Sequence, residues 1–435
     1  MGRAQERSET TMLHAVSLLG LCTFLLMAWG LSEDRQRIPW RVIAWGLGLQ
    51  LVLGVLLLRT GLRGYLFEGV SAAFALLRDA TNAGASFVFG DFTRLFILSE
   101  GAVAGELIDG QFVPLEGDVL LGAAVAFQVL PVIIFVSGLS AILYHLRVIQ
   151  VFVQAFAWLM RRTLKTSGAE TLGAALLMFI GIEAVSAIRG YLANMTRSEL
   201  CTVMTTFMAT IAGSVMIIYA TFGAEPGHLL TASLMSAPAA MVISKLMVPE
   251  REEPETAGGN PATLTVETRN VIDAATQGTT QGLHMALNVG AMLIVFLGLV
   301  YLLDAATMAI AGMSFAGVLA YAFMPFAWLM GVGTQDARVL AELLGTKTVF
   351  NEFLAYAALQ GHIAEGTLSP RGVTIATYAL CGFANPGSVG IMIAGLDALI
   401  PERRAEVSSL ALRAFIGGTL ACFVTACMAG ILLDA

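Results

Sequence analysis

The sequence predicts an all-α polytopic membrane protein with about eight transmembrane helices, two opposed re-entrant hairpins, interfacial helices and an inverted repeat. Of its 435 residues, 57% are hydrophobic and 13% are charged, whereas a soluble domain has about 25% charged residues. The mean hydropathy is +0.79. Several apolar stretches reach the roughly 20 residues that cross a bilayer. Others are interrupted by glycine, proline or charge, which indicates hairpins or broken helices.

The predicted spans follow one another along the whole chain. They are Met12 to Leu31, Trp40 to Leu58, Val119 to Tyr144, Leu200 to Ala220, Leu229 to Val248, Leu293 to Leu303, the interrupted span 372–400, and Leu410 to Leu433. A signal peptide is the competing interpretation of the first span. Against it, no small-x-small cleavage site precedes Ser32, and a second apolar segment follows closely.

Five units are predicted from these spans and from the segments between them. They are N-terminal spans with an interfacial helix (1–117), a scaffold span with an interfacial helix (118–168), a first hairpin repeat (169–248), an acidic linker with a long scaffold helix (249–313), and a second hairpin repeat (314–435). We expect the two hairpin repeats to form the transport part. The interfacial helices are predicted at 62–117 and 148–160, where charged and apolar residues mix.

Two segments are apolar but unsuited to a simple crossing. Residues 169–196 contain Glu183 and several glycines, and residues 314–332 contain Pro325. We expect 169–196 to form one re-entrant hairpin, and 314–332 together with 336–360 to form the second, around Asn351-Glu352. The order hairpin, span, span then occurs twice, and such inverted repeats place a substrate site near the membrane midplane.

A polar stripe precedes the apolar part of the long scaffold helix. Its residues recur every three or four positions, which places them on one helical face. They are Asp273, Gln277, Gln281, His284 and Asn288. Such a stripe faces the protein interior, where it either lines a water path or bonds to neighbouring helices.

The stretch from Thr377 to Ile393 is the strongest pointer to a binding site. It is apolar enough for a membrane, yet Gly382 and Pro386 interrupt it. Proline removes a backbone donor and glycine loosens a helix, so a helix here should break and free backbone polar groups. Interrupted spans of this kind mark the substrate site of many transporters.

Polar residues inside apolar segments are the candidate site residues. An ionisable group in the membrane costs about 2.5–3.5 kcal/mol on insertion scales, so Glu352 and Glu183 are functional candidates. The structural alternatives are pairing of Glu352 with Lys347 and of Glu183 with Arg189. Further along, Asn385 and Ser388 could bind ligand or cap the broken helix, and Phe383 could contact ligand or only pack.

Several function classes have little support. There is no phosphate-binding loop, paired-carboxylate box or nucleophile elbow, so we expect no enzyme and no catalytic residue. The histidines and methionines show no metal spacing, the five cysteines fit no disulfide framework, and no cofactor is expected. A net charge of −7 argues against nucleic-acid binding.

Several long motifs, in order, resemble the concentrative nucleoside transporter family, and the similarity covers the chain from about residue 120 to the end. The motifs are Gln128-Val129-Leu130-Pro131, Met195-Thr196-Arg197-Ser198-Glu199-Leu200, Asn351-Glu352-Phe353-Leu354-Ala355-Tyr356, Leu368-Ser369-Pro370-Arg371, Ala379-Leu380-Cys381-Gly382-Phe383-Ala384-Asn385 and Ile400-Pro401-Glu402-Arg403-Arg404.

The resemblance implies a lipid-embedded homotrimer in the inner (plasma) membrane whose protomers import nucleosides by cation symport. It implies that Glu352, Asn385 and Ser388 hold the ribose and that Phe383 lies beside the base. Glu183 would lie on the nucleobase side, and Val215 would supply an apolar contact. The implied cation ligands are a backbone carbonyl at Phe179, a hydroxyl at Thr210, and Glu183.

The chain departs from the family pattern in the first hairpin. Gly181 and Ile182 stand where the family has a Gln-Thr pair, and Leu176 stands where sodium-coupled members have an asparagine. Leucine offers no oxygen ligand, so we expect coupling to protons rather than sodium, with Glu183 or Glu352 as the titrating group, since a buried carboxyl can titrate near neutral pH. The alternative function is a nucleoside-binding sensor that does not concentrate its ligand.

Overall fold

The computed structural model describes residues 2–90, 105–108, 111–114, 125–181, 185, 187–257 and 268–433. Within these ranges the regular secondary structure is helical except for one hairpin of two short strands, β1 (Gly105–Ile108) and β2 (Gln111–Pro114). Five helices are long and apolar enough to cross a membrane. The chain is therefore a multi-pass membrane protein.

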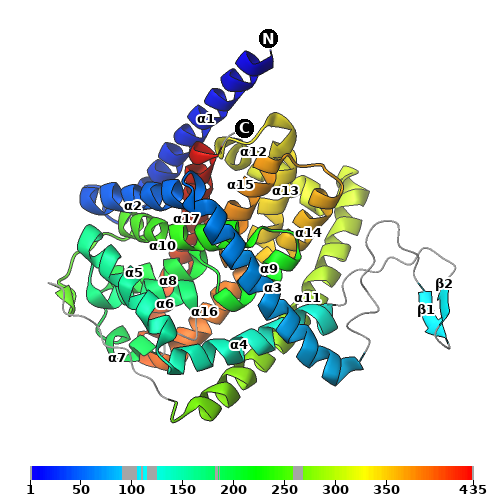
Figure 1. The fold of residues 1–435 in the computed structure, drawn as a ribbon. Helices are drawn as coiled ribbons and strands as arrows, with labels where there is room; N and C mark the ends of the chain where they lie inside the picture. Colours follow the sequence, from blue (N-terminus) through cyan, green and yellow to red (C-terminus); the bar gives the residue numbers. More distant parts are fainter. Residues whose placement is uncertain are drawn as a thin grey trace.

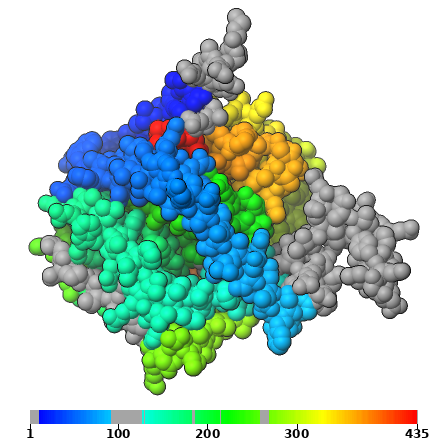
Figure 2. Space-filling model, in the orientation of Figure 1, coloured from blue at the N-terminus to red at the C-terminus, as the bar shows by residue number. Residues whose placement is uncertain are grey.

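The first three helices wrap around the C-terminal and central helices. α1 (Gly2–Gly30) packs against α17 (Arg404–Leu432), and α2 (Trp40–Leu58) packs against α10 (Pro226–Met247). α3 (Leu62–Phe89) then runs diagonally across one face of the molecule (Figures 1 and 2) and packs on α10. α3 is the part of the predicted interfacial segment 62–117 that is helical in the described residues.

A sharp bend separates the third predicted span from its interfacial helix. A π-helical turn (Val125–Val129) leads into α4 (Leu130–His145), and α5 (Val148–Leu164) follows at 74° to it. Arg147 makes the corner with a positive φ of 63°. This agrees with the predicted span and amphipathic helix, although residues 119–124 of that span lie outside the described residues.

The same order of elements occurs twice in the rest of the chain. The first unit holds α6 (Gly168–Phe179) and the short α7 (Arg189–Leu192), then α8 (Arg197–Ala209), α9 (Gly213–Thr221) and α10. The second holds the hairpin arms α13 (Thr334–Val349) and α14 (Glu352–Ala364), then α15 (Pro370–Leu380), α16 (Pro386–Leu399), a 3₁₀ turn (Pro401–Arg403) and α17. Each unit thus has a broken helix followed by a continuous helix. In the second unit these follow the hairpin of α13 and α14, and in the first they follow α6 and α7, between which residues 182–184 and 186 lie outside the described residues.

Two details of the predicted repeat are wrong. Leu200 to Ala220 is not one span, because the chain is extended at Thr210 and Ala212 between α8 and α9. The sequence has no proline there to signal the break. In addition, 314–332 is not a hairpin arm. It forms a separate helix, α12 (Phe315–Leu329), which continues through Pro325. The hairpin consists of α13 and α14 and turns at Phe350 and Asn351, where the turn was predicted.

The long scaffold helix is α11 (Val271–Ala311), with 41 residues. It packs lengthwise against α4 and leaves much of its surface exposed, including Ile294 (77%) and Ile310 (87%). Counted by length, the described residues give five spans, or six if the bent pair α4 and α5 counts as one. The other two of the eight predicted spans are the broken helices α8–α9 and α15–α16.

Candidate functional site

A cavity of about 580 Å³ lies between the broken helices, the second hairpin and α11. It is lined from the first repeat by Gly181, Phe207, Val215 and Tyr219, and from the second by Asn351, Glu352, Phe383, Asn385 and Ser388. Most of its wall is apolar, and the polar groups come from the second hairpin, from the two broken helices and from α11. This is the composition of a small-molecule site whose orientation is set by a few polar contacts.

Glu352 is the only carboxylate among the described residues that line this cavity. It begins α14, so its charge lies at a helix N-terminus, which favours an anion. Its Oε1 accepts a hydrogen bond from the Tyr219 hydroxyl at 2.8 Å, and its Oε2 accepts one from Asn385 Nδ2 at 2.7 Å. The hydrogen-bond partners of Glu352 are thus Tyr219 and Asn385. Lys347, the alternative partner that the sequence suggested, donates from Nζ to the carbonyl oxygen of Ala379 at 2.8 Å.

Asn385 does two things at once. Its Oδ1 accepts from the backbone N–H of Ser388 at 2.8 Å, which caps α16. Its Nδ2 holds Glu352, as above. Asn351 caps α14 in the same way, through Leu354 N–H at 2.9 Å. The N-termini of α14 and α16, with the side-chain amides of Asn351 and Asn385 that cap them, therefore lie at the same cavity.

The apolar side of the cavity is built from both repeats. Phe383 stacks obliquely on Phe207, with ring centroids 5.6 Å apart, and both rings line the cavity. Val215 and Gly181 lie on the same wall, and Gly181 has a φ of 101°, which favours glycine. Ile182 and Glu183 lie outside the described residues.

The polar stripe on α11 forms the remaining wall. Gln281, His284 and Asn288 line the cavity, whereas Asp273 and Gln277 bond to each other at the start of the helix. The sequence left two roles for the stripe, lining a water path or bonding to neighbouring helices. The position of Gln281, His284 and Asn288 on the cavity wall fits the first role.

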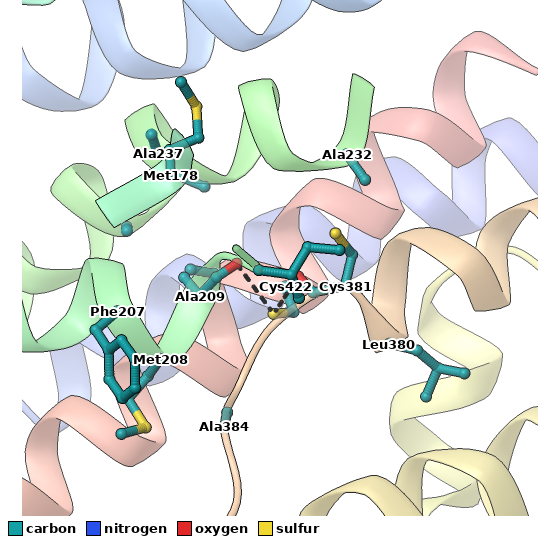
Figure 3. Packing of buried hydrophobic residues seen from close by; sticks show 14 of the residues in the cluster. Met178, Phe207, Met208, Ala209, Ala232, Ala237, Leu380, Cys381, Ala384 and Cys422 are labelled. Carbon is teal, nitrogen blue, oxygen red and sulfur yellow. Dashed lines mark hydrogen bonds between the residues drawn. The ribbon is translucent and has the colours of Figure 1, made fainter. Parts of the chain in front are cut away.

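The two helix breaks meet at Cys422 (Figure 3). The Cys422 thiol, on α17, donates to the carbonyl oxygen of Ala209 at 3.7 Å and to that of Cys381 at 3.4 Å, which are the carbonyls where α8 and α15 end. A Cβ added to Gly382 would lie 2.9 Å from the carbonyl oxygen of Met208. The absence of a side chain at Gly382 thus lets the two unwound segments touch.

Two of the three residues predicted to bind a cation, Phe179 and Thr210, lie near the first of these breaks, and Glu183 lies outside the described residues. Thr210 directly follows α8, and its hydroxyl donates to the Thr206 carbonyl at 2.8 Å, which leaves its lone pairs as acceptors. The Phe179 carbonyl oxygen lies beside Gly213, 3.1 Å from where a Cβ would stand. Leu176 is fully buried in the last turn of α6. Across the described part of the chain, no group of His, Cys, Asp or Glu is arranged to hold a metal ion.

Tyr219 is a site residue that the sequence analysis did not identify. It lies within a predicted span as an ordinary aromatic, and nothing in the local pattern distinguishes it from the packing residues around it. Only the break before α9 turns its hydroxyl toward Glu352. The available signal was its position four residues after Val215, on the same helical face.

A polar pocket between two broken helices and a hairpin, in a multi-pass protein with a repeated order of elements, is the arrangement of many secondary active transporters. Comparison with family models agrees. The family model for the C-terminal part of Na+ dependent nucleoside transporters matches residues 228–430, and the model for their N-terminal part matches residues 19–92. A third model, described as a gate for nucleoside recognition, matches residues 126–226. The chain belongs to the concentrative nucleoside transporter family, as its motifs predict, and this is a family of transporters rather than enzymes.

Relatives cover nearly the whole chain. Solute carrier family 28 member 3 of Rattus norvegicus is 38% identical over 96% of this chain and 59% of that protein. Sodium/nucleoside cotransporter 1 of Homo sapiens is also 38% identical, over 96% of this chain and 63% of that protein. The chain thus spans less than two thirds of the length of these curated relatives.

Solved structures match over nearly the full length of both chains. CNTnw in an inward-facing substrate-bound state has a TM-score of 0.86 and 32% identity, covering 97% of this chain and 98% of that one. A variant of CNTnw in an outward-facing state has a TM-score of 0.87 at the same identity and coverage. The all-helical, hairpin-rich fold is therefore that of the family.

Proposed function

We propose that this chain imports nucleosides by cation symport, as a lipid-embedded homotrimer in the plasma (inner) membrane. The observation that carries the proposal is the Glu352–Asn385 pair at 2.7 Å, which lies in a largely apolar cavity formed by both repeats. A nucleoside has a sugar with vicinal hydroxyls and a flat base, so it needs both kinds of wall. Homotrimer formation rests on the family resemblance, and the exposed apolar surface of α11 is available to lipid or to a second copy.

The roles of the residues follow from their chemistry. The carboxylate of Glu352 accepts hydrogen bonds from ribose hydroxyls, and the Asn385 amide and Ser388 hydroxyl can donate or accept. Phe383 offers its ring to the base, and Val215 and Gly181 add apolar contact. In this proposal Ile182 and Glu183 complete the base side.

Coupling to protons rather than sodium is the finer part of the proposal. Transporter sodium sites use oxygen ligands, with unwound backbone carbonyls among them. The Phe179 carbonyl and the Thr210 hydroxyl supply two such oxygens, but the fully buried Leu176 supplies none. A carboxyl in the pocket, Glu183 or Glu352, would then carry the proton.

Uptake by proteoliposomes tests both parts. Labelled uridine should accumulate against its gradient when the inside is alkaline, with sodium absent on both sides. A sodium gradient that drives uptake while a pH gradient does not would refute proton coupling but leave transport intact. Binding without accumulation under either gradient would instead identify a sensor.

Leu176→Asn sharpens the cation test, because it adds an amide oxygen at the position in question. We expect a sodium gradient to stimulate uptake by this variant more than uptake by the unmodified protein. Glu352→Gln keeps the size of the side chain but removes its charge. It should lower uptake by about a hundredfold, because hydrogen bonds to charged groups are worth roughly 1.5–3 kcal/mol each.

A further inference from the structure

The carboxylate of Glu352 is held from both halves of the chain. Asn385 on α16 occupies one oxygen from within the second repeat, and Tyr219 on α9 occupies the other from the first repeat. Each carboxylate oxygen has two lone pairs, so each can still accept one more hydrogen bond. Two neighbouring hydroxyls of a sugar match that remaining capacity.

Tyr219 is itself held rigidly. Its side chain is fully buried, and its ring stacks on that of Tyr356 with centroids 4.2 Å apart and planes at 15°. One turn away, Phe222 meets Phe353 edge to face at 5.1 Å. Tyr219 and Phe222 are three residues apart, at the end of α9 and just after it, and their partners Phe353 and Tyr356 are three apart on α14. Two aromatic contacts and one hydrogen bond therefore join the end of α9 to α14.

We infer that Tyr219 is a positioning residue for nucleoside binding. Its hydroxyl fixes the Glu352 carboxylate so that the remaining lone pairs of both oxygens serve the sugar hydroxyls. The hydrogen bond is charge-assisted and buried, which makes it one of the stronger kinds. Glu352 on the second hairpin therefore recognises the sugar only while α9, which belongs to the first repeat, keeps Tyr219 within hydrogen-bond distance of it.

This inference rests on the proposed function, so the experiment must separate the two. Tyr219→Phe removes one oxygen and keeps the stacked ring. Tyr356→Phe is the matched control, because it removes one oxygen from the other ring of the same stack, where the hydroxyl donates to the Thr377 carbonyl at 2.8 Å. KM and maximal rate are measured for uridine and for 2′,3′-dideoxyuridine, which lacks the vicinal hydroxyls.

Tyr219→Phe should raise KM for uridine about ten- to a hundredfold, the range for a charge-assisted hydrogen bond. It should leave the maximal rate and the KM for dideoxyuridine within about threefold, as should Tyr356→Phe for both nucleosides. In a Glu352→Gln background, Tyr219→Phe should have little further effect. Equal effects of Tyr219→Phe on both nucleosides, or no effect, would overturn the inference.

Two further readouts keep the outcomes distinct. If the unmodified protein neither binds nor accumulates uridine, the proposed function fails independently of Tyr219. If Tyr219→Phe does not fold, 3-fluorotyrosine at position 219 keeps the ring and hydroxyl but alters the strength of the donor. A changed KM for uridine alone is then expected, and equal changes for both nucleosides contradict the inference.

Discussion

Gly382→Ala tests whether the two unwound segments must touch. A Cβ at this position would lie 2.5 Å from Cys422 Sγ, 2.9 Å from the Met208 carbonyl oxygen and 3.0 Å from the Ala209 carbonyl carbon. Two of these three atoms belong to the backbone, so the clash cannot be relieved by turning a side chain. Gly382 has no positive φ, so the penalty comes from crowding and not from backbone conformation.

The expected cost follows from that crowding. Extra carbon in a packed interior costs about 1–3 kcal/mol, and we expect the upper part of this range because backbone must move. The movement would also displace Asn385, which follows three residues later and holds Glu352. Uptake of uridine should therefore fall by more than the loss of folded protein explains.

Gly390→Ala is the control, because Gly390 lies on α16 of the same broken helix and a Cβ there meets nothing within 4 Å. Alanine in a helix is favoured over glycine by about 0.5–1 kcal/mol, so this variant should be as stable as the parent or slightly more so. Thermal unfolding in detergent and uptake per folded molecule are measured for both. The reasoning is refuted if Gly382→Ala unfolds and transports like Gly390→Ala.

Three further predictions concern other parts of the fold. Cys422→Ala should lower the free energy of unfolding by about 1–2 kcal/mol. It should also lower uptake more than Cys201→Ala does, because Cys422, unlike Cys201, bonds to the carbonyls at both helix breaks. Equal uptake by the two variants would count against this role. Arg371→Lys should lower the free energy of unfolding by about 2 kcal/mol or more. The buried guanidinium donates to the carbonyls of Gly331, Leu433 and Gly430 at 3.0, 2.9 and 2.7 Å, and a lysine cannot make all three bonds in the same geometry. The control is Arg338→Lys at an exposed ion pair, which should cost under about 1 kcal/mol. The Arg197 guanidinium, 2.9 Å from Glu33, lowers the pKa of that carboxyl from its ordinary 4.5. Glu33 therefore stabilises the fold above that pH and stops doing so as the pH falls through its lowered folded-state pKa. The melting temperatures of the parent and Glu33→Gln should differ at pH 7 and converge as the pH falls through that folded-state pKa; a difference that does not shrink on acidification would contradict the assignment.

Much of the fold could be predicted from the composition and from the positions of helix-breaking residues in the sequence. Pro386 and Gly382 predicted the break between α15 and α16, because proline and glycine act on the backbone locally. The apolar runs around Trp40 to Leu58 and Leu229 to Val248 predicted α2 and α10 for the same reason, since crossing a bilayer requires only length and hydropathy. The break between α8 and α9 could not be predicted, because no proline marks it and the Cys422 thiol that meets its Ala209 carbonyl comes from α17, 213 residues away.

The candidate site divides in the same way. The charge of Glu352 in an apolar segment identified it without a structure, because an ionisable group in a membrane is costly wherever it packs. The bonds of Glu352 to Tyr219, and of Asn385 to both Glu352 and its own helix, were decided only by the tertiary structure. A hydrogen bond depends on the distance and direction between groups 133 residues apart, and local sequence carries no information about that geometry.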